Sequence, residues 1–205
     1  MNHTAHTAEV HRDDLASKTG MWLFLYTEML LFGALFVVYS VYRYRNTEAF
    51  HLAAEELDTT IGTINTIILL ISSATIAMSI TAIQLKNKKL ALALLSVTII
   101  AGLVFLVNKY FEWGHHIKEG IYPGSEILRA RGYGDVMFYG LYYFMTGVHA
   151  LHIIIGLTFI GFIVVYIIKD EVKHDDFVVH ENAGLYWHLV DLIWIFLFPL
   201  FYLIT

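Results

Sequence analysis

Residues 186–196 read YWHLVDLIWIF and place His188 and Asp191 three positions apart in an apolar run. A soluble domain tolerates such a pair at the edge of its core, whereas a lipid bilayer makes each polar group costly. The whole chain decides between these two solvents. Of its 205 residues, 58% are hydrophobic and 15% are charged, and the mean hydropathy is +0.62. Because soluble domains carry roughly a quarter charged residues, the composition indicates a membrane protein.

Five apolar runs are each long enough to cross about 30 Å of hydrocarbon as a helix. They cover residues 20–42, 62–85, 90–112, 136–168 and 183–204. A helix satisfies its backbone hydrogen bonds within one segment, which crossing lipid requires. We therefore predict an all-α, polytopic membrane protein with a bundle of five transmembrane helices. Residues 1–17 are expected to form a flexible polar tail, and residues 18–205 a single transmembrane domain.

The loop charges predict which side of the membrane each terminus faces. Lys86, Lys88 and Lys89 crowd the tight turn between the second and third runs. Short basic loops stay on the cytoplasmic side. We therefore expect the N-terminus inside and, after five spans, the C-terminus outside. The longer segment 114–135 is expected to be a loop on the outer side.

Two features of the composition exclude whole classes of function. The chain contains no cysteine, so it has neither a disulfide nor a cysteine-ligated metal or heme site. Its formal net charge of −5 at pH 7 lacks the basic footprint of a nucleic-acid-binding protein.

Away from the ends of the predicted spans, five ionisable residues are expected at membrane depth: Glu28, His149, His152, His188 and Asp191. Glu28 and Asp191 each lie about 12 Å into their spans, so we expect the five groups to meet at a similar depth. A metal site is disfavoured because helical metal pairs more often use i,i+4 spacing. A proton path within this chain would need more such groups. We favour polar groups that hydrogen-bond helices together or face a partner subunit or lipid, with Glu28 neutral or held by a hydrogen bond.

Two other stretches have simpler interpretations. The second run, within residues 62–85, is dense in Ser, Thr and Ala, which suits close helix–helix contact in lipid. Lys109, Glu112, His115 and His116 follow where the third run leaves the membrane. We expect these four side chains to form a solvated face.

Several motifs follow one another along residues 18–204. They are TGMWLFLYTEMLLFGALFVVYS at 19–40, TINTIILLISSATIAMS at 63–79, KYFEWGHHIKEGIYPGS at 109–125, YYFMTGVHALHIIIGLTF at 142–159 and AGLYWHLVDLIWIFLFPLFYL at 183–203. Together they resemble the heme–copper oxidase subunit III family in its five-helix bacterial form. By this resemblance, Glu28 corresponds to the family's intramembrane glutamate, and His149 and His152 to its TG-x-H-x-x-H motif. The segment before and within the last helix is matched by Glu181, Tyr186, Trp187, His188, Asp191 and Trp194.

The resemblance implies a subunit with no catalytic, cofactor or metal site of its own, within an oxidoreductase complex that reduces oxygen to water. Subunit III packs on catalytic subunit I of a proton-pumping terminal oxidase of the aerobic respiratory chain and supports stability, proton uptake and lipid binding. Its setting would be the bacterial cytoplasmic membrane, with further oxidase subunits and phospholipid as partners, and with heme and copper in the partner subunits. The number of histidines is consistent with a subunit that has no catalytic centre. Three histidines lie within the spans, whereas a heme–copper centre needs about half a dozen histidine ligands.

Two alternatives stay open at this point. One is an accessory subunit of a nitric oxide reductase of the same family, and the other is a small proton-coupled transporter. The electron donor, cytochrome c or quinol, is not defined by the sequence, because its site would lie on other subunits.

Overall fold

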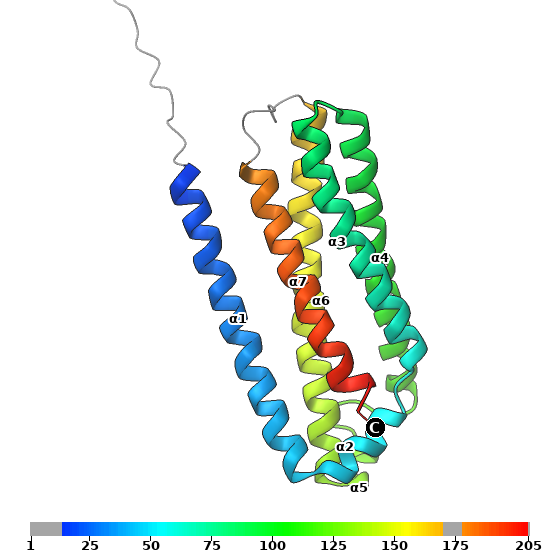
Figure 1. The fold of residues 1–205 in the computed structure, drawn as a ribbon. Coiled ribbons are helices and arrows are strands. Elements are labelled where there is room, and N and C mark those ends of the chain that lie inside the picture. Colours follow the sequence, from blue (N-terminus) through cyan, green and yellow to red (C-terminus); the bar gives the residue numbers. More distant parts are fainter. Residues whose placement is uncertain (1–13, 170–177, 205) are drawn as a thin grey trace, which may run out of the picture.

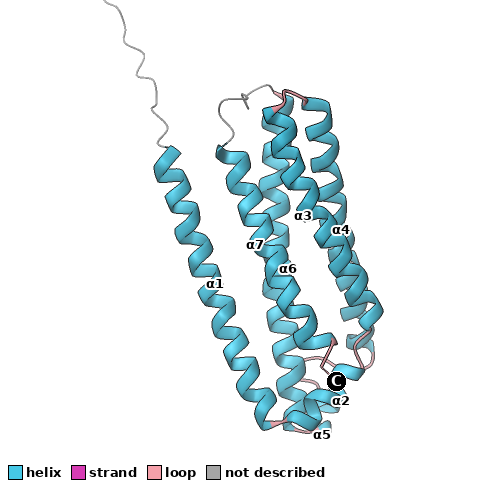
Figure 2. Cartoon of the chain, in the orientation of Figure 1, coloured by secondary structure: helices cyan, strands magenta, loops and turns pink. Residues whose placement is uncertain are grey.

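The computed structural model describes residues 14–169 and 178–204, which form helices and, within these ranges, no strand (Figure 1 and Figure 2). Within the described residues, five helices are long and apolar enough to span a membrane: α1 (Asp14–Arg45), α3 (Thr59–Gln84), α4 (Lys88–Lys118), α6 (Tyr133–Ile168) and α7 (Val178–Tyr202). The short helices α2 (Thr47–Glu55) and α5 (Glu126–Arg131) lie in connecting segments. The predicted all-α bundle of five spans is therefore confirmed, whereas the side that each terminus faces stays a prediction.

The helices extend beyond the predicted runs. α1 begins at Asp14, so residues 14–17 of the predicted tail are helical, and residues 1–13 lie outside the described residues. The predicted loop at 114–135 contains the last turn of α4 and all of α5, where the Ser125 hydroxyl caps the Leu128 N–H at 3.0 Å. Hydropathy detects the lipid-facing part of a helix, while backbone hydrogen bonding continues into the polar residues beyond it.

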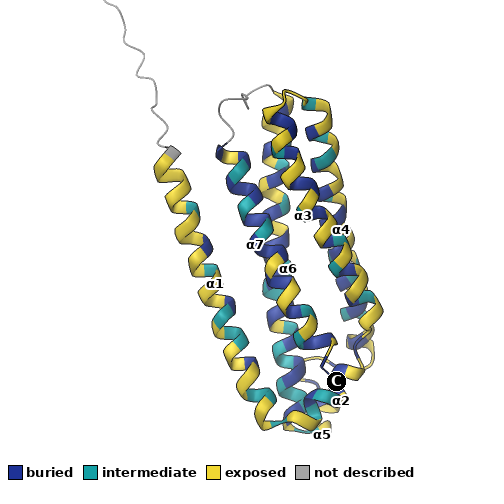
Figure 3. Ribbon diagram, viewed as in Figure 1, coloured by how far each residue is buried: buried dark blue, intermediate teal, exposed yellow. Residues whose placement is uncertain are grey.

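α7 is the central helix of the bundle. Its backbone lies close to the backbones of α1, α2, α3 and α6, whereas the backbone of α1 lies close to those of α2, α6 and α7. In an apolar 18-residue stretch of α7, 56% of the residues are buried, whereas in the corresponding stretch of α1 the buried share is 11%. Figure 3 accordingly shows exposed residues along most of α1. The buried residues Leu25, Phe32 and Tyr39 recur every seven positions, so α1 packs through one narrow stripe.

Glycine residues let the central helix approach its neighbours closely. The fully buried Trp187 lies against Gly156 of α6 and Gly102 of α4, where an added Cβ would come within 2.8 Å and 2.9 Å of the indole. The indole N–H donates to the Ser72 hydroxyl of α3 at 3.0 Å. Trp187 therefore joins α7 to three other helices, and α3 makes the close contact that its small residues favour.

α2 and the end of α5 are fixed to α6 by a carboxylate. Arg131 donates to both oxygens of Glu56, at 2.7 Å and 2.8 Å, and the Tyr139 hydroxyl donates to the same carboxylate at 2.7 Å. Burial acts to raise the pKa of Glu56, but the hydrogen bonds from Tyr139 and Arg131 outweigh it and hold that pKa below its usual value. The bond to Glu56 is also the main cause of the raised pKa of Arg131.

Candidate functional site

A carboxyl–imidazole contact joins α1 to α6. Glu28 Oε2 lies 2.9 Å from His152 Nε2, and the two side chains are 14% and 10% exposed. His152 Nδ1 lies 2.7 Å from the Val148 carbonyl oxygen, which can only accept, so Nδ1 carries a hydrogen. The bond to Glu28 therefore contains one proton, carried either by the carboxyl or by the second imidazole nitrogen. Glu28 thus has a hydrogen-bond partner on another helix.

A ladder of side-chain hydrogen bonds joins α3 to α7. Each rung pairs a ring nitrogen of α7 with a hydroxyl of α3: Trp194 with Thr66 at 3.0 Å, His188 with Ser73 at 2.7 Å, Trp187 with Ser72 at 3.0 Å and His180 with Ser79 at 2.9 Å. From Trp194–Thr66 through the adjacent middle pairs to His180–Ser79, the contacts advance along α3 while they go back along α7, as in any antiparallel pair. Because a polar group left unpaired in an apolar interior is costly, the ladder fixes the register of the two helices.

The five ionisable residues predicted to meet at one depth do not form one cluster. His149 is fully buried and stacks on Trp194 with ring centres 5.3 Å apart, and its nitrogens have no hydrogen-bond partner among the described residues. Asp191 is 3% exposed; within the described residues its oxygens have no partner of standard geometry, although the Ser73 hydroxyl lies beside it. These residues therefore make separate contacts, because i,i+3 spacing defines a helix face but not the neighbour that this face meets. Their similar depth in the membrane stays a prediction.

The other predicted residues of α7 contact α1 and α6. The Tyr186 hydroxyl donates to the His152 carbonyl oxygen at 3.0 Å, and the Tyr186 ring stacks on Phe24 of α1 with centres 5.9 Å apart. Glu181 pairs with Lys18 at 3.0 Å, where α7 and α1 both begin. Sequence reasoning selected Tyr186 and Glu181, but their partners are visible only in the structure.

A buried cluster near the end of α4 was not predicted. Lys109 Nζ donates to Glu112 Oε2 at 3.0 Å and to the Tyr202 hydroxyl, while the Tyr142 hydroxyl donates to Glu112 Oε1 at 2.5 Å. We call Lys109, Glu112, Tyr142 and Tyr202 the lysine cluster. It joins α4 to α6 and α7, and the tyrosines and the opposite charge compensate the burial of the ammonium group.

The lysine cluster corrects the predicted solvated face. Lys109, Glu112 and His116 are 3%, 5% and 4% exposed, whereas the His115 side chain is 72% exposed. Positions 109, 112 and 116 share one face of a helix by their spacing, and this signal was present in the sequence. It was missed because we ended the third span at residue 112, while α4 stays helical to Lys118.

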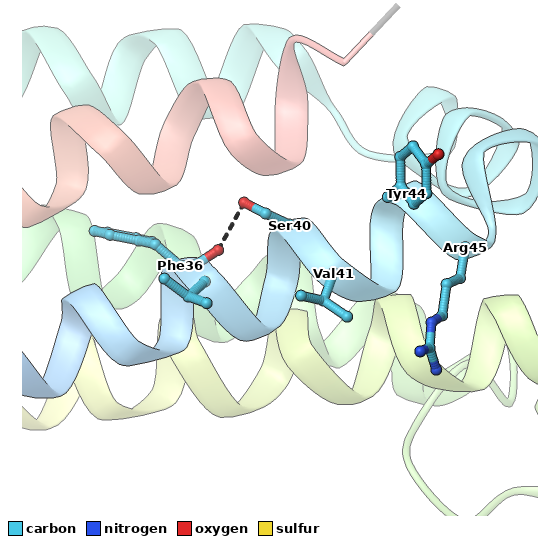
Figure 4. A pocket seen from close by; sticks show the side chains of 6 residues that line it. Phe36, Ser40, Val41, Tyr44 and Arg45 are labelled. Carbon is cyan, nitrogen blue, oxygen red and sulfur yellow. Dashed lines mark hydrogen bonds between the residues drawn. The ribbon is translucent and has the colours of Figure 1, made fainter.

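A recess of about 570 Å³ beside the C-terminal half of α1 has a different character (Figure 4). Among the described residues its lining comes from α1 alone, and Tyr44 and Arg45 point in different directions. The Ser40 hydroxyl donates to the Phe36 carbonyl of the same helix at 2.8 Å. This recess is therefore a surface of one helix and has no convergent polar groups.

The contacts as a whole serve to hold helices together. Among residues 14–169 and 178–204, no three His, Asp or Glu side chains converge on a position that could hold a metal ion. The hydrogen bonds that run from Glu28 through His152 stop at the Val148 carbonyl oxygen, and the hydrogen bond of His188 stops at the Ser73 hydroxyl. The fold and these contacts define a polytopic α-helical membrane protein whose buried polar groups bind its own spans to one another.

Comparison with known proteins identifies the family within this class. The chain belongs to the cytochrome c oxidase subunit III family, whose sequence model matches residues 2–205. It is 28% identical over 208 residues to the probable quinol oxidase subunit 3 of Staphylococcus saprophyticus, with 100% of this chain and 97% of that protein covered. The same protein of Staphylococcus haemolyticus is 27% identical with the same coverage.

A longer relative carries two subunit names. The chain is 29% identical over 193 residues to the heme–copper oxidase subunit I+III of Aeropyrum pernix; the match covers 91% of this chain and 22% of that protein. The chain is therefore a non-catalytic subunit III of a heme–copper oxidase, which confirms the family predicted from its motifs.

Proposed function

We propose that this chain serves a quinol-oxidising heme–copper oxidase in the cytoplasmic membrane of a bacterium. Its full-length similarity to two Staphylococcus proteins named as probable quinol oxidase subunits supports this donor and this setting. Heme and copper are expected in the partner subunits. The basic turn at 86–89 supports an N-terminus inside and a C-terminus outside. The chain following the polar tail then acts as one transmembrane domain.

We infer that the intramembrane polar contacts keep the five spans in one arrangement, so that the bundle can pack on catalytic subunit I. The Glu28–His152 contact carries this inference, because it joins two helices at membrane depth within this chain. Interhelical hydrogen bonds in lipid contribute about 0.6–2 kcal/mol each, enough to favour one helix arrangement over its alternatives. A bundle of fixed shape would stabilise the catalytic subunit, support its proton uptake and offer grooves beside α1 to phospholipid.

Purification of the affinity-tagged chain from its native membranes in mild detergent tests this function. We expect a heme-bearing subunit in equal amount, a heme absorption spectrum, and oxygen consumption with a short-chain quinol but not with reduced cytochrome c. Recovery of the chain mainly as a heme-free monomer would contradict the assembly. Turnover with cytochrome c in place of quinol would contradict the proposed donor and leave the assembly intact.

A further inference from the structure

A pocket of about 380 Å³ lies between the start of α1, the end of α6 and the start of α7. Its volume falls within the range of small-molecule sites, about 300–1,000 Å³. Met21 of α1 and Phe159 and Phe162 of α6 supply apolar and aromatic walls. The lining also contains three neutral polar side chains, those of Ser17, Tyr166 and Asn182.

The polar side chains gather at one end of this pocket. Ser17 and Asn182 are the fourth and fifth residues of α1 and α7, and Tyr166 lies two residues before the end of α6. All three are thus within about 6 Å of a helix end, at a rise of 1.5 Å per residue. Phe159 lies farther along α6, about 14 Å from that end. The pocket therefore has a polar end near the helix ends, which we call the mouth, and an apolar part along α6. A ligand with a polar head and an apolar chain requires this arrangement.

The mouth contains a buried polar group with unused hydrogen-bonding capacity. Asn182 is 8% exposed, and its Nδ2 donates to the Ser17 hydroxyl at 3.1 Å. Its Oδ1 has no hydrogen-bond partner among the described residues. A buried polar atom in a native structure is normally paired, so a ligand with a hydroxyl group would supply the missing donor after a small adjustment of the amide.

Charge distinguishes this pocket from the groove on the other side of α1. That groove, about 360 Å³, is lined by Lys18, Glu181 and His188 among other residues. The ion pair of Lys18 with Glu181, at 3.0 Å, suits a charged phospholipid head group. Among the described residues, the lining of the α1–α6–α7 pocket contains no charged side chain. These residues fit a neutral head, and the aromatic side chains fit a planar ring.

We propose that the α1–α6–α7 pocket binds an isoprenoid quinol, with the hydroxylated ring at the Ser17, Tyr166 and Asn182 mouth and the chain along α6. The proposal concerns binding alone, and the ring enters and leaves chemically unchanged. It holds whichever electron donor the complex uses, because it follows from the shape and polarity of this pocket.

Photolabelling of the intact oxidase in phosphatidylcholine nanodiscs with a short-chain quinol bearing an azide tests the proposal. We expect saturable labelling of the peptides that contain Met21, Phe162 or Tyr166, displaced by unlabelled short-chain quinol and not by added phosphatidylglycerol. Labelling of the catalytic subunit in the same sample is scored separately. Absence of saturable labelling on these peptides, or displacement by phospholipid and not by quinol, would overturn the proposal.

Two variants in the pocket and one control make the test specific. Tyr166→Phe and Asn182→Leu each remove a polar group at the mouth and should weaken labelling roughly two- to tenfold, the effect of one lost hydrogen bond. Tyr166 is 40% exposed, so its variant is expected to fold even if Asn182→Leu does not. Trp22→Phe, in the groove on the other side of α1, should leave labelling unchanged. Equal labelling in Tyr166→Phe and the unmodified complex would overturn the assigned mouth.

Discussion

Removing the Glu28–His152 contact should loosen α1 from the rest of the bundle. In Glu28→Leu, His152 Nε2 loses its partner at 2.9 Å, while Nδ1 stays bonded to the Val148 carbonyl at 2.7 Å. A buried polar atom left unpaired costs about 1–3 kcal/mol. His152→Leu should have a comparable effect, because it leaves the carboxyl unpaired. The double variant removes both polar groups, so we expect it to cost clearly less than the sum of the two single variants.

The expected loss is large enough to measure in the assembled complex. At 1.4 kcal/mol per factor of ten, it corresponds to roughly a 5- to 150-fold change in the equilibrium between docked and undocked α1. Subunit retention after graded detergent washing, together with the midpoint of thermal dissociation, reports this equilibrium. Thr27→Val is the matched control, since the exposed Thr27 hydroxyl donates to Phe24 of its own helix at 2.7 Å. Strictly additive single effects in the double variant would refute the paired contact.

Glu28→Gln determines which atom carries the shared proton. The amide of Gln can donate to His152 Nε2, so this variant should retain assembly and most turnover. We expect the infrared difference spectrum between wild type and Glu28→Gln to show the carbonyl band of a protonated carboxyl. A neutral pair leaves no separated charges within lipid, where ion desolvation is costly. A carboxylate band at neutral pH, without the protonated band, would show that the pair is ionic.

Three further predictions concern the other contacts. Ser72→Ala removes the acceptor of the Trp187 N–H and should destabilise the subunit by about 1–3 kcal/mol; unchanged thermal dissociation would contradict the ladder. Lys109→Met leaves Glu112 as an uncompensated buried charge, which costs about 3–5 kcal/mol, and should increase protease cleavage between α4 and α6; unaltered cleavage would argue against the lysine cluster. Folding lowers the pKa of Glu56, so the stabilisation that its carboxylate provides is fully present above the pKa of the unfolded chain, about 4.3. This stabilisation is lost as the pH falls through the pKa of Glu56 in the folded protein. The stability difference between wild type and Glu56→Gln should therefore shrink in acid, and a difference independent of pH would refute this.

The sequence contained enough information to find the spans, because apolar length is a property of each segment alone. Contacts between segments were a different matter. Glu28 was recognised as a group that needs a partner, but that partner, His152, lies 124 positions away. His149, His188 and Asp191 were equally plausible partners by their depth in the spans. Which neighbour a helix face meets depends on how all the helices pack, and one sequence does not show this.

The lysine cluster shows where more could have been read. The i,i+3 spacing of Lys109 and Glu112 indicated one helix face and an ion pair within reach. Tyr142 and Tyr202, which complete the cluster, lie 33 and 93 positions from Lys109. α2 was missed for another reason: it has nine residues, too few for a hydropathy window, although Phe50 is fully buried.

α1 and α7 are held by different means, and this difference determines where a weakened subunit opens first. α7 is held by the packing of Trp187 against Gly156 and Gly102 and by the ladder of hydrogen bonds to α3. The loss of one hydrogen bond therefore leaves extensive packing. α1 has one narrow buried stripe and relies on contacts such as Lys18 with Glu181 and Glu28 with His152. Interhelical hydrogen bonds of similar strength therefore provide a larger share of the docking energy of α1. The proposed quinol pocket is built by α1, α6 and α7, so we expect loss of the Glu28–His152 contact to distort the pocket as well as to loosen α1.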